Sequence, residues 1–179
     1  MTAARSVGGK VVSGLYGRAL HKWLTPEVRD ALRVAGIAVG QWEPAYSYEV
    51  WLEGLRRVSA TMFPEQLQPA ALRSLGRKVI DGLREGGVLK GAYVTMAKFA
   101  GPRRVLRQLD GQRIDGVEFL QPKVVERGSK AVEVELKDVE CLAFLAGALE
   151  AALDALGVRD GRVEISVRGE TGVLAVSWS

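Results

Sequence analysis

Hydrophobic and polar residues alternate along three short stretches in the last third of the chain. Residues 131–137, Ala-Val-Glu-Val-Glu-Leu-Lys, place their valines and leucine on one face and their charged residues on the other. Residues 162–168 repeat the alternation, and residues 173–178 continue it after a turn rich in glycine. The pattern predicts an antiparallel sheet of three strands with one buried face.

A helix is predicted between the first two strands, over residues 139–156. Its leucines recur at helical spacing, and residues with small side chains recur every four positions. The small stripe consists of Ala143, Gly147, Ala151 and Ala155. Because small side chains allow two backbones to approach closely, we expect another element to pack tightly against this stripe.

The first two thirds of the chain are predominantly helical in pattern. Thr25-Pro26 and Ser47 are helix-start signals, Pro69 and Pro102 open further helices, and Gly or Pro follows most of the apolar stripes. The expected elements are a leading strand over 10–16, helices over 25–35, 47–62, 69–85, 88–99 and 102–109, and an extended segment over 117–126.

These elements together predict an α+β fold, in which a helical N-terminal half precedes a C-terminal antiparallel sheet packed on one long helix. The chain has 179 residues, of which 47% are hydrophobic, enough for one substantial core. We therefore expect a single domain over residues 1–179, with residues 1–9 as a flexible tail.

Charge and cysteine content narrow the functional classes. The 25 Lys and Arg residues are interspersed with 21 Asp and Glu residues, so no block of like charge indicates nucleic acid. One cysteine, Cys141, cannot form an internal disulfide, and one histidine, His21, leaves too few ligands for a zinc site. With no signal-peptide pattern or membrane-spanning run, we expect a cytoplasmic protein.

Several short stretches of sequence resemble an uncharacterised, largely myxobacterial family of paralogous proteins. They are Gly14–Leu20, Tyr48–Leu55, Phe63-Pro64, Leu75–Arg77, Gly101–Arg103, Phe144–Glu150 and Val176–Trp178. The order of elements is also distantly similar to the haem-nitric-oxide-binding domain and to the four-vinyl-reductase type of ligand-binding domain. This similarity implies a ligand site between the helical half and the sheet.

The haem-binding relatives need an axial histidine on a helix and a Tyr-x-Ser-x-Arg signature for the haem propionates. The corresponding segment here, Leu106–Ile114, has no histidine, and the signature does not occur. We therefore predict that the resemblance extends to the fold and not to the cofactor, and that the protein binds neither haem nor a structural metal.

Other candidate chemistry has simpler interpretations. His21 has no sequence partners, and Cys141 begins an apolar helix, so neither indicates a catalytic site. Glutamates on the polar face of the sheet could act as acid and base, but their alternation with Lys and Arg favours cross-strand charge pairs. The arginines of the 69–85 and 102–109 helices could form a phosphate- or nucleic-acid-binding surface, although no aromatic residues are interleaved with them.

The sequence thus favours a non-enzymatic module that binds a small ligand or a protein partner, including itself as a homodimer. The alternatives are an enzyme of unknown class and the arginine-rich binding surface. Large soft side chains available to line a pocket are Trp51, Met62, Phe63, Tyr93, Met96 and Phe99, with Arg77 as an anchor for an acidic group. Trp42, in the loop between two helices, either folds back on the core or contacts a partner.

Overall fold

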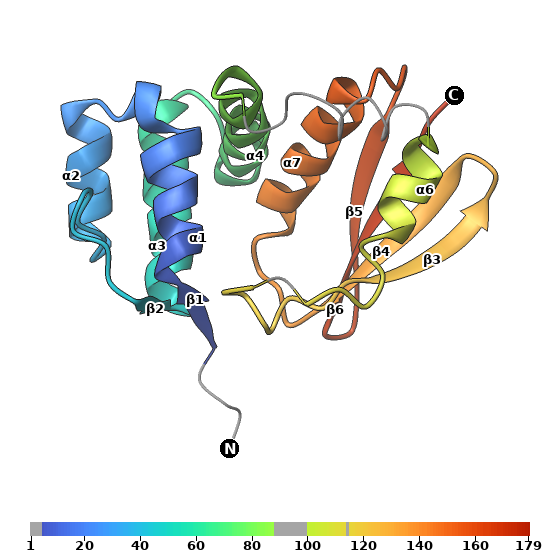
Figure 1. Cartoon of the computed structure of the whole chain (residues 1–179), viewed down its shortest axis with the longest axis horizontal. Helices are drawn as coiled ribbons and strands as arrows, with labels where there is room; N and C mark the ends of the chain where they lie inside the picture. Colours follow the sequence, from blue (N-terminus) through green and yellow to red (C-terminus); the bar gives the residue numbers. More distant parts are fainter. Residues whose placement is uncertain (1–4, 88–99, 114) are drawn as a thin grey trace.

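The computed structural model describes residues 5–87, 100–113 and 115–179, which form a helical lobe and a sheet lobe (Figure 1). The helical lobe contains β1 (Ser6–Gly8), α1 (Gly9–Val12), η1 (Ser13–Ala19), η2 (His21–Trp23), α2 (Pro26–Val34), β2 (Ala45–Ser47), α3 (Tyr48–Met62) and α4 (Gln68–Glu85). The sheet lobe contains α6 (Pro102–Arg107), β3 (Lys123–Gly128), β4 (Ala131–Lys137), α7 (Leu142–Ala155), β5 (Arg162–Arg168) and β6 (Thr171–Ser177).

The sheet lobe confirms the predicted α+β fold. Its four strands are antiparallel in the order β3-β4-β6-β5. Val134 pairs with Val124 on one side and with Leu174 on the other, and the valines and leucine of β4 are buried as the alternation predicts. The extended segment predicted before the first hairpin becomes β3 only after Pro122, because proline cannot donate a ladder hydrogen bond.

The predicted helix starts in the helical lobe are also confirmed. The hydroxyl of Thr25 accepts a hydrogen bond from the Val28 N–H, and the hydroxyl of Ser47 accepts one from Val50 at 3.2 Å. α4 begins at Gln68 and ends before Gly86. The helix predicted over 88–99 lies outside the described residues.

The leading strand predicted over 10–16 is wrong, because this segment is helical. α1 runs directly into η1, a π-helix in which each N–H bonds to the carbonyl five residues earlier. Val12, Tyr16 and Ala19 are all buried, at the spacing of one helix face. This face packs on the core of the helical lobe, and that burial outweighs the strand preference of valine and the glycines at 14 and 17.

The structure also corrects the expected tail over residues 6–8. These residues form β1, which pairs antiparallel with β2. Val7, the middle residue of β1, is fully buried. No helix in the described ranges is both long enough and apolar enough to cross a membrane.

α4 and α7 meet backbone to backbone, and this contact joins the two lobes (Figure 1). A Cβ atom on Gly147 of α7 would lie 1.9 Å from the Arg73 carbonyl oxygen of α4. A Cβ atom on Gly76 of α4 would lie 2.0 Å from the Phe144 carbonyl oxygen of α7. The small-residue stripe predicted on α7 therefore accepts α4, and each helix contributes one glycine that makes the approach possible.

Candidate functional site

A mostly apolar pocket of about 350 Å³ lies where α1, η1, α3 and α4 face the start of α7. Its size is at the lower end of the range for ligand pockets, so it suits a small molecule. Four of its residues come from the π-helix η1, a form of helix found often at functional sites. We call it the junction pocket. It is lined by Lys10, Val11, Gly14, Leu15, Arg18, Ala19, Trp51, Val79, Leu83 and Phe144.

Trp51, one of the residues that line this pocket, carries a buried hydrogen-bond donor. The side chain is only 6% exposed, and its indole N–H has no acceptor within the described part of the chain. A buried donor without an acceptor costs about 1–3 kcal/mol.

Two cations, Lys10 and Arg18, stand at the rim. Both side chains are exposed, and neither forms an ion pair with any residue that the structure describes. They therefore give the entrance of an otherwise apolar pocket a positive potential.

Phe144 connects the pocket to the contact between the lobes. Its ring lines the pocket and packs edge-on against Trp51, with 6.4 Å between the ring centroids. Its backbone carbonyl is the group that approaches Gly76 on α4. Phe144 therefore belongs both to the pocket lining and to the close contact between α4 and α7.

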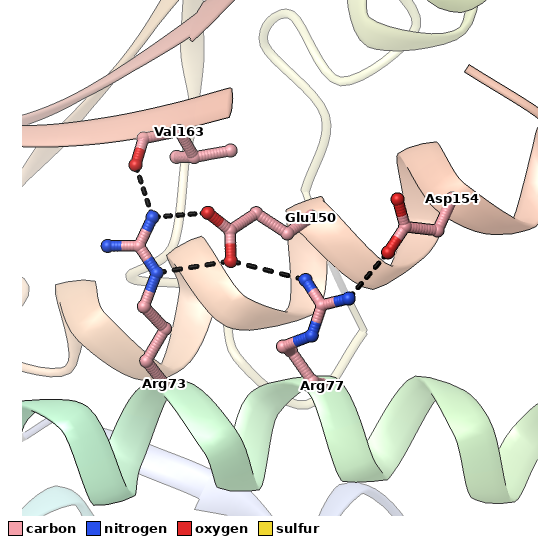
Figure 2. Close-up of polar contacts among 5 residues, drawn as sticks. All are labelled: Arg73, Arg77, Glu150, Asp154 and Val163. Atoms are coloured by element: carbon pink, nitrogen blue, oxygen red, sulfur yellow. Dashed lines mark hydrogen bonds and ion pairs between the residues drawn. The ribbon is translucent and has the colours of Figure 1, made fainter. Parts of the chain in front are cut away.

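An ion-pair network of four charged residues also joins α4 and α7 (Figure 2). Arg73 of α4 forms two hydrogen bonds with Glu150 of α7 and donates a third to the Val163 carbonyl of β5. Arg77, one turn later, contacts Glu150 at 3.3 Å and Asp154 at 2.5 Å. The ion-pair network fixes α4 to both α7 and the edge of the sheet.

Glu150 is the centre of the ion-pair network, and its side chain is 16% exposed. Burial alone raises the pKa of the Glu150 carboxyl, but the hydrogen bonds and charges of Arg73 and Arg77 outweigh it, so the pKa lies below its ordinary value. The carboxylate is thus ionised at neutral pH and attracts both arginines.

Among the predicted pocket residues that the structure describes, one lines the junction pocket. That residue is Trp51, whereas Met62 lines a separate cavity with Trp23, and Phe63 packs at the C-terminal end of α3. Arg77, expected as an anchor in the pocket, pairs instead with the acids of α7. The remaining three candidates, Tyr93, Met96 and Phe99, lie outside the described residues.

Trp42 is half-buried, and its ring lies over Gly17, with Cζ2 3.1 Å from the position of a Cβ atom there. It packs against the edge of the core cluster. This geometry favours the folded-back alternative, and its use as an anchor for a partner stays a prediction.

The predicted charge pairs on the sheet are present. Glu133 accepts hydrogen bonds from Arg127 and Arg168, and Glu135 pairs with Lys123. The hydrogen bonds from these two arginines lower the pKa of Glu133 to about 2. Glu133 is therefore a paired anion and not a poised acid or base.

Within the described part of the chain, the cysteine and the histidine do not belong to a catalytic or metal-binding cluster. Burial raises the pKa of the Cys141 thiol to about 12, so the thiol stays protonated and unreactive at neutral pH. His21 is exposed, and its Nδ1 atom lies 2.7 Å from the Arg18 carbonyl oxygen. Over residues 5–87, 100–113 and 115–179, no group of three His, Cys, Asp or Glu side chains could hold a metal ion.

Comparison with known proteins gives a family and a fold. The model of a family described as "Protein of unknown function (DUF2378)" matches residues 5–179. No curated protein matches the sequence.

Solved structures of H-NOX domains, the haem-nitric-oxide-binding fold, superpose on almost the whole chain. An oxygen-binding H-NOX domain related to soluble guanylate cyclases, in its oxygen complex, is 16% identical, with 96% of this chain and 94% of that chain covered and a TM-score of 0.61. The Fe(II) unliganded H-NOX protein from K. algicida is 11% identical, with 96% of both chains covered and a TM-score of 0.62. At this identity the similarity confirms the fold that the sequence resemblance implied.

The residues around the junction pocket do not fit a haem. Haem iron is held by His, Cys, Met or Tyr side chains, and none of these occurs among the residues that line the pocket. The only histidine of the chain lies on η2, outside the pocket lining, and the only cysteine is a buried thiol at the start of α7. The residues that line the junction pocket therefore offer no axial ligand for haem iron.

Proposed function

The chain belongs to the protein family DUF2378, and from that premise we propose that it is a non-enzymatic sensor domain that binds a small organic ligand without haem. The junction pocket carries this proposal. It is mostly apolar, it is formed by elements of both lobes, and its lining includes Trp51, whose buried indole N–H has no acceptor among the described residues. One of the structures with the same fold is an oxygen complex, so the fold itself is compatible with binding of a small ligand.

The lining of the pocket defines the chemistry of the ligand. Leu15, Val79, Leu83 and Phe144 offer apolar contacts to a hydrocarbon or aromatic body. The Trp51 N–H offers one hydrogen bond, and the rim cations favour negative charge. The ligand class that fits best is a small carboxylate with an apolar body.

Ligand binding is coupled to the rest of the molecule through Phe144. A ligand that contacts its ring presses on the α7 turn whose carbonyl touches Gly76. Any adjustment there changes the spacing of α4 and α7, the helices that hold the two lobes together. The signal is then a small rearrangement between the two lobes, which a protein partner bound to the sheet lobe would detect.

The experiment compares two ligands of equal chain length, octanoate and octan-1-ol, by isothermal titration calorimetry. We expect octanoate to bind more tightly than octan-1-ol, because only octanoate carries the charge that Lys10 and Arg18 attract. Trp51→Phe should weaken octanoate binding about tenfold, the value of one hydrogen bond to a charged group.

Two valine variants serve as a matched pair. Val79→Trp fills the junction pocket and should abolish binding, whereas Val34→Trp, at an exposed position on α2, should leave it unchanged. Equal binding by both variants, or no difference between octanoate and octan-1-ol in the wild type, contradicts the proposal.

A further inference from the structure

Strand β5 forms one edge of the sheet, and no strand within the described residues pairs with its outer side. Its first inward-facing residue, Val163, is buried beneath α7, but the next two on that face, Ile165 and Val167, are 39% and 67% exposed. Exposed apolar residues on an unpaired edge strand are a site for pairing with another strand.

The hydrogen bond from Arg73 shows which peptide groups of β5 point outward. Arg73 donates a hydrogen bond to the Val163 carbonyl (Figure 2). Because this carbonyl bonds to a group outside the sheet, we infer that it faces away from β6. In an antiparallel strand the N–H and C=O of one residue point to the same side, and alternate residues point the same way. Ile165 and Val167 therefore direct their peptide groups to the open edge.

We propose that β5 pairs with β5 of a second copy of this chain, in antiparallel orientation, to form a continuous eight-stranded sheet across a twofold axis. The pairing places Ile165 opposite the partner's Val167, and Ser166 opposite itself on the axis. The outward peptide groups of Ile165 and Val167 then meet those of the partner in hydrogen-bonded pairs. Isologous pairing of this kind is the commonest form of self-association.

Charge selects this register over its neighbours. In the proposed pairing, Glu164 lies opposite the partner's Arg168, and this pair occurs twice. A shift that places Ile165 on the axis sets Arg162 against the partner's Arg168, two like charges. The next shift sets Glu164 against the partner's Glu164. Like charges directly opposite each other destabilise a sheet.

Two features of the monomer fit the same register. Arg73 already donates a hydrogen bond to the Val163 carbonyl, so this carbonyl is not available to a second copy. The unpaired edge therefore starts at Glu164, which is also the first residue of the proposed pairing. Arg168 already binds Glu133 on the outer face, while 55% of its side chain remains exposed. The partner's Glu164 can therefore approach Arg168 without breaking the existing pair, which extends a charge network from one copy to the next.

Cysteine substitution tests the register directly. Ser166→Cys places two thiols opposite each other at a non-hydrogen-bonded position, where Cα atoms lie about 4.5 Å apart and a disulfide can form. Mild oxidation of the full-length variant should give a covalent dimer on non-reducing gels. Glu164→Cys is the matched control, since its two copies lie four residues out of line, about 13 Å apart. The native Cys141 is buried and adds no exposed thiol.

Charge reversal tests the interface in solution. By light scattering over a concentration series, the wild type should approach the mass of a dimer, whereas Glu164→Arg alone and Arg168→Glu alone should be monomers. An equimolar mixture of these two variants should form a heterodimer, because each reversed charge then faces its opposite. This recovery also shows that both variants are folded.

Val167→Pro removes only an outward N–H and should likewise give a monomer with unchanged circular dichroism. A monomeric wild type at high micromolar concentration overturns the proposal. So does a dimer that cross-links through Glu164→Cys but not through Ser166→Cys, or one that survives Val167→Pro.

Discussion

Replacement of Gly147 by alanine should weaken the contact between the lobes. The added Cβ atom meets the Arg73 carbonyl oxygen at 1.9 Å, whereas real Cβ contacts are essentially never shorter than 3.0 Å. The obstacle is backbone, so α4 and α7 must separate by about 1 Å. Overpacking of this kind costs about 1–3 kcal/mol.

A smaller effect opposes this cost. Alanine is favoured over glycine in a helix interior by about 1 kcal/mol. The separation also lengthens the hydrogen bonds between Arg73 and Glu150, which adds to the cost. We therefore expect a net loss of about 1–2 kcal/mol in the free energy of unfolding, which lowers the melting temperature by about 2–8 °C for a chain of this size.

Urea denaturation followed by circular dichroism measures this difference, and Gly14→Ala is the control. Gly14 is also helical, but an added Cβ atom there meets nothing within 4 Å. Its replacement should be neutral or stabilising by up to about 1 kcal/mol. If Gly147→Ala is as stable as Gly14→Ala, the helices are not in the close contact described above.

Three further predictions concern charge and cofactor. Glu150→Gln leaves Arg73 and Arg77 without their shared carboxylate and should lower the free energy of unfolding by about 1–2 kcal/mol in urea denaturation, with a smaller loss at 1 M salt; an unchanged midpoint contradicts the role given to the ion-pair network. The pKa of Glu133 is depressed to about 2 in the folded state, so its pairing stabilises the protein above about pH 4.5 and this contribution is lost as the pH falls towards 2. Glu133→Gln should therefore flatten the acid limb of the stability curve measured by thermal unfolding, and an identical curve speaks against the pairing. Reconstitution with haem should give no Soret band that depends on a protein ligand; a band that His21→Ala abolishes contradicts the poor fit between the described residues and haem.

The sheet lobe could be predicted from the sequence because its information is local. Alternation with a period of two marked β4, β5 and β6, and leucines at helical spacing marked α7. The segment 10–16 shows the limit of such reasoning. Val12, Tyr16 and Ala19 carry a helical signal, but the adjacent valines and two glycines suggested a strand, and burial in the helical lobe decided the outcome. β1 and β2 are three residues each and exist only because they pair with one another.

The junction pocket could not be predicted because five elements contribute to it. Val79 and Leu83 belong to the helix that the sequence predicts over 69–85, but helical spacing does not show which residues of a helix are left facing a cavity. Arg77 was assigned to a pocket because its partners were unknown. The four-residue spacing of Arg73 and Arg77 matches that of Glu150 and Asp154, and this was the available signal that α4 and α7 pair through charge.

The most direct test of the central claim observes the Trp51 indole N–H during ligand binding. In protein labelled with ¹⁵N at its four tryptophans, loss of one indole signal in Trp51→Phe assigns that signal. On titration with octanoate, we predict that the Trp51 signal moves downfield as its N–H gains an acceptor, and that the Trp178 signal does not move. The shift should disappear in Val79→Trp. A Trp51 signal that stays in place at saturating octanoate, or one that shifts equally in Val79→Trp, contradicts the assignment of this pocket as the ligand site.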